Sequence, residues 1–192
     1  MTAEEALKLL KEGNKRYIEG NSIHPHSDPK YRKSLANEQH PFAVILTCAD
    51  SRVTPEILFD CGLGDLFVIR VAGNVAKEKV VGSIEYAIKY LNANLVVVMG
   101  HEKCGAVSAA MSDAEPGGHI GRILENIKPA VYIARTMKGD TLTNAIKLNA
   151  QIVSEHLKEN KPIIEDAVKA GGVKIYSSYY ELSSGKVEFF DA

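Results

Sequence analysis

The sequence has little cysteine, no tryptophan, no excess of charge of one sign and no long apolar run. Its 192 residues include 3 Cys, and 23 basic residues face 24 acidic ones, for a net charge of −1. No Lys- or Arg-rich run stands out, which argues against a surface for nucleic acid or an anionic membrane. The longest apolar runs, residues 41–48 and 95–100, fall far short of the roughly 20 residues that a membrane span needs. We therefore expect a soluble, cytoplasmic protein.

The scarcity of cysteine excludes two further classes. Cys48, Cys61 and Cys104 cannot all pair, and their spacing matches no small disulfide-rich domain, so a reducing compartment is expected. A Cys₄ iron–sulfur cluster is excluded by the count. The sequence also has no G-x-S-x-G nucleophile elbow and no complete dinucleotide fingerprint. The thiols are therefore free to act as metal ligands or nucleophiles.

The hydrophobic pattern predicts an α/β fold with a mostly parallel central sheet flanked by helices. A chain of this length can build its core without a metal, so a bound metal would serve chemistry. Short apolar segments alternate with helical ones, which is typical of βαβ units. Predicted strands cover 42–47, 66–71, 95–99, 173–181 and 186–190, the last two forming an edge hairpin, and predicted helices cover 3–20, 31–39, 80–91, 105–111, 120–137, 142–159 and 162–170, with another opening at Pro55. The loop at 21–29 suggests a division into an N-terminal helical arm, residues 1–40, and an α/β domain, residues 41–192.

Two strand ends carry unusual residues. The first strand runs into Cys48-Ala49-Asp50-Ser51-Arg52, and the third runs into His101-Glu102-Lys103-Cys104-Gly105. Ligands of open α/β sheets bind at the carboxyl ends of the strands, so both motifs belong to the same edge. His101 and Cys104 can reach one ion if the chain bends there, and Cys48 is a third donor. Two thiolates and one imidazole with an open fourth position form a catalytic type of zinc site.

Asp50 and Arg52 complete this interpretation. In an extended segment residues 48, 50 and 52 point to the same side, so carboxylate and guanidinium lie beside the thiolate and can pair bidentately. Two thiolates already cancel the charge of Zn²⁺, and Asp50 competes with water for the fourth position. By holding Asp50 away, Arg52 favours the water-bound state, in which Asp50 accepts the hydrogen of the zinc-bound hydroxide.

These paired motifs resemble those of the β-class carbonic anhydrases, and the similarity runs from the opening helix to the final hairpin. The resemblance implies one Zn²⁺ per subunit held by Cys48, His101 and Cys104, with Asp50 as a fourth ligand in a closed state. It implies an Asp50–Arg52 catalytic dyad and a Gly105 N–H that helps to hold Asp50. The implied reaction is the reversible hydration of CO₂ to bicarbonate and a proton by metal-bound hydroxide.

The resemblance also implies a substrate cleft and an oligomer. Gln39, Phe67, Tyr86 and Ala72 stand where the family lines its CO₂ cleft, and part of that lining comes from the neighbouring subunit. A dimer or a dimer of dimers is therefore expected, with the opening helix lying across the partner. No nucleic-acid or membrane partner is expected.

One departure from the family concerns its bicarbonate-regulated subset. That subset has a Trp three residues before the first zinc Cys, where this chain has Ile45. Arg70 matches an Arg of the subset but has no Trp partner here. The water-bound form is therefore expected.

Other interpretations stay open at this point. The nearest alternative is a carbon disulfide or carbonyl sulfide hydrolase on the same scaffold, and another is a non-catalytic zinc- or bicarbonate-binding homologue. Cys48 alone reads as a core residue, and Asp50 with Arg52 as a structural ion pair. The combination with His101 and Cys104 makes both readings improbable. Cys61 matches no ligand position, and the remaining histidines are expected to be solvated.

Overall fold

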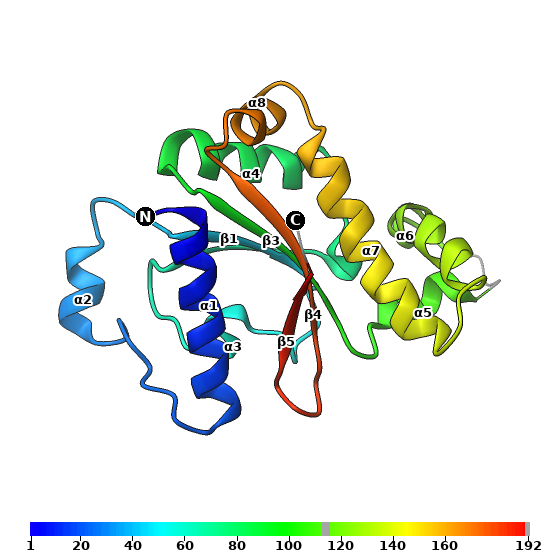
Figure 1. The fold of residues 1–192 in the computed structure, drawn as a ribbon, viewed down its shortest axis with the longest axis horizontal. Coiled ribbons are helices and arrows are strands. Elements are labelled where there is room, and N and C mark those ends of the chain that lie inside the picture. The colour runs from blue at the N-terminus through cyan, green and yellow to red at the C-terminus, as the bar shows by residue number, and fades with distance from the viewer. Residues whose placement is uncertain (113–115, 191–192) are drawn as a thin grey trace.

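A computed structural model describes residues 1–112 and 116–190 and shows one five-stranded sheet (Figure 1). The strand order is β2-β1-β3-β4-β5. All neighbouring strands are parallel except β4 and β5, which pair antiparallel at one edge. The strands are β1 (Ala43–Thr47), β2 (Leu66–Arg70), β3 (Leu95–His101), β4 (Lys174–Tyr180) and β5 (Val187–Phe190). The predicted α/β class and edge hairpin are confirmed.

The helices follow the predicted order, with small shifts at their ends. They are α1 (Ala3–Ile18), α2 (Pro29–Ser34), α3 (Pro55–Leu58), α4 (Glu78–Leu91), α5 (Gly105–Met111), α6 (Ile120–Ala134), α7 (Thr141–Lys158) and α8 (Ile163–Lys169), with a 3₁₀ turn η1 (Ala72–Asn74). The second helix begins two residues earlier than predicted because the Asp28 carboxylate caps it, accepting from the N–H groups of Lys30 and Tyr31. Within the described part of the chain, every helix is too short or too polar to span a bilayer.

Helices cover both faces of the sheet. On one face, α1 and α3 pack against side chains such as Ile45 and Val97. On the other face, α4, α7 and α8 pack against Val44, Leu46 and Val98. All seven residues of β3 are buried, as expected of a central strand covered on both sides. The carboxyl ends of β1 and β3 therefore emerge from the most rigid part of the molecule.

Helix α1 packs in this core, and the expected division at residue 40 stays a prediction. Its apolar face, including Ala6, Leu7 and Leu10, is buried against the sheet of its own chain. Asn14 is also buried, and its side-chain Nδ2 donates to the carbonyls of Leu58 at 3.0 Å and Gly185 at 2.9 Å. The periodicity showed an apolar face but not which surface covers it. Contact between α1 and a partner subunit stays a prediction.

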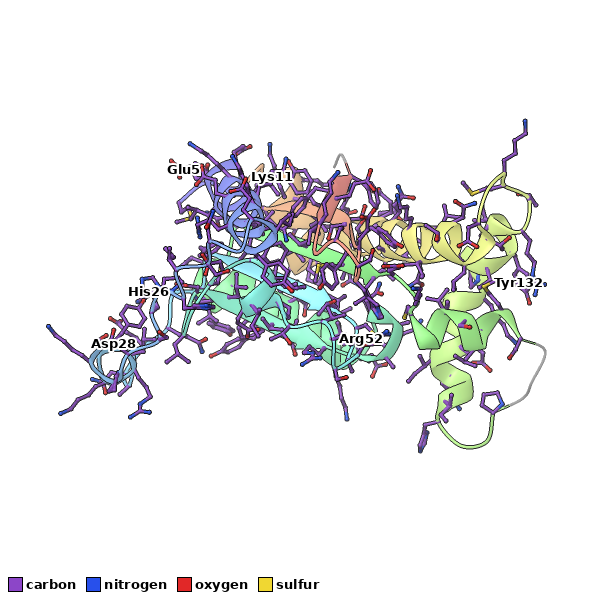
Figure 2. The ribbon with its side chains drawn as sticks, turned by 90° about the horizontal axis from the view of Figure 1, so that it is seen from below. Glu5, Lys11, His26, Asp28, Arg52 and Tyr132 are labelled. Atoms are coloured by element: carbon purple, nitrogen blue, oxygen red, sulfur yellow. The ribbon has the colours of Figure 1, made fainter. Side chains whose placement is uncertain are left out.

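The segment after α1, residues 21–40, is largely exposed. Helix α2 has no buried residue, and Asp28 lies far out at one end of the molecule (Figure 2). The segment is attached to the loop that precedes β2. His26 Nδ1 lies 2.8 Å from Asp65 Oδ1, and the side chain of Asp60 accepts from the N–H of His24 at 2.9 Å. This attachment sets the course of the chain toward Gln39.

Candidate metal centre

The two strand-end motifs meet at the carboxyl edge of the sheet. Strand β1 ends at Thr47, which pairs with Met99 of β3, so Cys48 and His101 follow on adjacent strands. Lys103 has a φ of 53°, a left-handed conformation that turns the chain back and places Cys104 at the start of α5. Ligand atoms of Cys48, His101 and Cys104 all lie within 4.8 Å of one another, and all three residues are buried. The predicted trio is thus brought together.

The distances and donors of this cluster fit zinc. The two sulfur atoms are 3.9 Å apart. Two zinc–sulfur bonds of about 2.3 Å at a tetrahedral angle require a separation of about 3.8 Å. His101 Nδ1 lies 2.9 Å from the carbonyl of Glu102, so Nδ1 carries the hydrogen and Nε2 presents its lone pair. Nε2 is buried without a hydrogen-bond partner among the described residues, which is the state expected of an atom that ligates a metal.

The two thiols affect each other strongly. The Cys104 thiol donates to Cys48 and, with help from the Gly73 N–H at 3.3 Å, lowers the pKa of Cys48 to about 4. The same bond to Cys48, together with burial, raises the pKa of Cys104. One proton therefore lies between two sulfurs that would repel each other as a pair of thiolates. A divalent cation bound by the two sulfurs would replace that proton and allow both thiolates to form.

Asp50 and Arg52 form the predicted bidentate pair, although in a turn rather than an extended segment. The N–H of Val53 donates to the carbonyl of Asp50 at 3.0 Å, which closes the turn. Arg52 Nε and Nη2 then reach the two carboxylate oxygens at 2.9 and 2.8 Å. Figure 2 shows Arg52 at the surface, whereas the Asp50 side chain is only 18% exposed. Donation by Arg52 holds the pKa of the Asp50 carboxyl far below its usual range, so this residue is a carboxylate.

The pair lies beside the ligand cluster. Asp50 Oδ2 is 3.9 Å from His101 Nε2, the atom that would bind an ion. The carboxylate is thus within reach of a water molecule held in a fourth coordination position. The site combines three donors and an ionised acceptor.

The remaining residues predicted close to the metal are Gly105 and Ala72. Gly105 begins α5 directly after Cys104, but the hydrogen bonds described for the Asp50 carboxylate come from Arg52 and none comes from Gly105. Ala72 begins η1, one residue before the Gly73 whose N–H donates to Cys48. Ala72 therefore borders the cluster, whereas the role of Gly105 stays a prediction.

The other predicted cleft residues lie away from the ligands of their own chain. Phe67 pairs with Val44 in the sheet, four residues before Cys48. At about 3.3 Å per residue, this separates it from the ligand by roughly 13 Å along the strand. Tyr86 of α4 contacts Phe67 with ring centroids 6.4 Å apart and is 48% exposed. Gln39 lies in the exposed segment after α2.

Sequence reasoning missed one residue that supports the site. Asn149 of α7 is buried, and its Nδ2 donates to the carbonyl of Gly73 at 2.8 Å, so it holds the residue whose own N–H reaches Cys48. A polar residue within the buried stripe of a helix was the available signal, because Asn149 lies between Ile146 and Ala150, which are both buried.

A comparison with known protein families decides the classification. Residues 43–187 match the family model described as carbonic anhydrase. The chain belongs to the β-carbonic anhydrase family. A Mycobacterium tuberculosis protein named carbonic anhydrase 2 is 40% identical over 193 residues, covering 97% of this chain and 92% of the relative. A Mycolicibacterium smegmatis carbonic anhydrase is 40% identical over 190 residues, covering 95% of this chain and 91% of the relative. The protein is therefore an enzyme of the carbonic anhydrase class.

Solved structures of β-carbonic anhydrases share the fold. One of two tetrameric enzymes from Sordaria macrospora superposes with a TM-score of 0.79 at 23% identity and covers 94% of each chain. The Aspergillus fumigatus enzyme CafA has a TM-score of 0.74 at 25% identity, covering 98% of this chain and 90% of its own. The similarity thus includes α1 and the edge hairpin as well as the ligand-bearing strands.

Proposed function

We propose that this carbonic anhydrase reversibly hydrates CO₂ to bicarbonate and a proton at a zinc ion held by Cys48, His101 and Cys104. The observation that carries the proposal is the geometry of the ligand cluster. The sulfur atoms are 3.9 Å apart, and His101 Nε2 is buried without a partner among the residues described. Both features match a tetrahedral Cys₂His site with one position left for solvent.

Zinc bound in this site would supply a Lewis acid that makes a water molecule nucleophilic near neutral pH. The protein's own residues orient that water. The carbonyl of Glu102 fixes the tautomer of His101, and Arg52 holds Asp50 with both carboxylate oxygens occupied. Asp50 Oδ2 accepts a hydrogen bond from the attacking water and directs its lone pair toward CO₂.

The cleft that holds CO₂ is proposed to form between two copies of the chain. Phe67 and Tyr86 lie far from the ligands of their own chain, yet Tyr86 is 48% exposed. Tyr90, whose ring centroid is 5.4 Å from that of Tyr86, is 64% exposed. An exposed aromatic surface of this kind is typical of an interface. A homodimer, or a dimer of dimers, would bring Gln39, Phe67 and Tyr86 of one copy to the zinc site of the other. Cytoplasmic location stays a prediction.

The decisive experiment is stopped-flow CO₂ hydration measured against pH on protein whose zinc content has been counted. A zinc-dependent rate that rises toward alkaline pH is expected. The reason is that zinc-bound water is a weaker acid when two of the zinc ligands are thiolates than when all three are neutral imidazoles. Carbon disulfide and carbonyl sulfide are assayed in parallel. If the enzyme turned over either of them in preference to CO₂, that compound would be assigned as the substrate. Zinc-loaded protein that is inactive on all three would refute the catalytic proposal and favour a binding role.

A further inference from the structure

Arg70, the last residue of β2, makes two contacts that strand pairing does not require. Its Nη2 donates to the main-chain carbonyl of Asp50 at 2.7 Å. Its Nε donates to the main-chain carbonyl of Cys48 at 3.4 Å. The residue itself is exposed, so burial of apolar surface does not explain where the guanidinium lies. One side chain therefore binds the backbone on both sides of Ala49.

The place of Arg70 in the sheet explains how it reaches these carbonyls. Strands β1 and β2 are in register up to the pair Thr47 and Arg70, and the N–H of Val71 donates to the carbonyl of Thr47 at 3.0 Å. After Thr47 the first strand leaves the sheet. Beyond that point the Arg70 guanidinium, in place of a neighbouring strand, binds the main-chain carbonyls of Cys48, the proposed metal ligand, and of Asp50.

Both the side-chain carboxylate and the main-chain carbonyl of Asp50 are consequently held by hydrogen bonds. Arg52 binds its carboxylate, while Arg70 and the N–H of Val53 bind its carbonyl. The carboxylate lies close to the ion-facing atom of the site, with Oδ2 at 3.9 Å from His101 Nε2. Zinc–oxygen bonds are about 2.1 Å long, so a small rotation of Asp50 would let the carboxylate take the fourth coordination position.

We propose that Arg70 is a positioning residue that keeps the fourth coordination position open by fixing the main chain of Asp50. The inference rests on the proposed zinc site. Because the guanidinium binds two carbonyls in different directions, its role depends on the planar fork of arginine as well as on charge. Lysine offers a compact ammonium without that fork and should replace it only in part.

The test uses protein loaded with Co²⁺ in place of zinc and titrated with thiocyanate, followed by visible absorption. Thiocyanate binds only where the metal has an open position. We expect Arg70→Met to keep full Co²⁺ content but to bind thiocyanate about tenfold more weakly than the wild type, with a similar fall in kcat of the zinc enzyme and little change in KM. Arg70→Lys should lie between the two.

A second variant shows whether the Asp50 carboxylate is the competing group. Adding Asp50→Ala to Arg70→Met should restore thiocyanate binding to the level of Asp50→Ala alone, because no carboxylate is left to occupy the position. A merely structural role for Arg70 would not give this rescue.

The matched control is Arg135→Met. Arg135 is also exposed, and its Nη2 donates to the main-chain carbonyl of Met111 at 3.0 Å, away from the ligands. This variant should bind thiocyanate like the wild type. Equal thiocyanate affinity in the wild type and Arg70→Met, or failure of Asp50→Ala to rescue, would overturn the role of Arg70. Wild-type protein that takes up no Co²⁺ would overturn the metal site itself, and a Co²⁺ spectrum that ignores thiocyanate would overturn the open fourth position.

Discussion

The ligand cluster and the expected cleft residues differ in how much of their setting one chain provides. Cys48, His101 and Cys104 are buried and complete within a single subunit. Tyr86 is half exposed, and Gln39 lies on the surface of the arm. The proposed metal ligands thus lie at the buried centre of the sheet. The expected substrate pocket lies at the surface, where a second copy of the chain can complete it. The two parts should respond differently to mutation and to mixing of subunits.

The largest effect is expected from removing a ligand. Cys48→Ser should abolish stable zinc binding and reduce CO₂ hydration to the uncatalysed rate, because a neutral hydroxyl replaces a thiolate donor. Metal analysis and stopped-flow assays measure both. Cys61→Ser is the matched control, since Cys61 lies outside the cluster and should keep zinc and activity. Full zinc content in Cys48→Ser would contradict the ligand assignment.

Asp50→Ala should separate metal binding from turnover. We expect zinc content to stay at one per subunit and turnover to fall by about 10²-fold, because the acceptor that orients the attacking water is lost. Zinc analysis alongside kcat measures the separation. Unchanged turnover would remove the proposed role of Asp50.

A subunit-mixing experiment tests the cleft between copies most directly. Tyr86→Ala should lower activity by about tenfold while keeping zinc. When this variant and Cys48→Ser are dissociated and reassociated together, a mixed dimer combines intact ligands from one chain with intact lining from the other. Random mixing should then restore about a quarter of wild-type activity. No recovery in verified mixed dimers would place the cleft within one chain.

The smallest effect on catalysis, and a clear effect on stability, is expected at Asp60. Burial opposes ionisation of its side chain, but hydrogen bonds from Arg16 and from the N–H groups of Ile23 and His24 outweigh it and lower the pKa of Asp60. A carboxyl whose pKa is lower in the folded state stabilises the protein above its unfolded pKa of about 3.9 and loses that contribution as pH falls through the folded pKa. Asp60→Asn should lower the free energy of unfolding by about 1–3 kcal/mol at pH 7.

Denaturant unfolding of this variant at a series of pH values provides the check. The difference from the wild type should shrink on acidification below about pH 4. A difference that stays constant over the whole range would show that the ionised state of Asp60 contributes nothing.

Much of the site could be predicted because its residues follow strand ends in recognisable motifs. The apolar run at 95–99 predicted β3, and the motif after it predicted a ligand pair on condition that the chain bends, a bend that the structure places at Lys103. The roles of Arg70 and Asn149 were missed because each acts on main-chain groups, which the sequence does not locate. The division at residue 40 stays a prediction, because α1 shows the same apolar stripe whether it covers its own sheet or a partner.

Asn14 has a consequence for how the molecule is made. Its side chain bonds the carbonyl of Gly185 and accepts from the N–H of Val187 at 2.9 Å, so one residue near the start of the chain closes on the final hairpin. A chain still on the ribosome lacks these partners until almost all of it has been synthesised. Until then Asn14 can reach Leu58 but lacks its partners in the final hairpin, so complete packing of the first helix depends on the residues that are synthesised last.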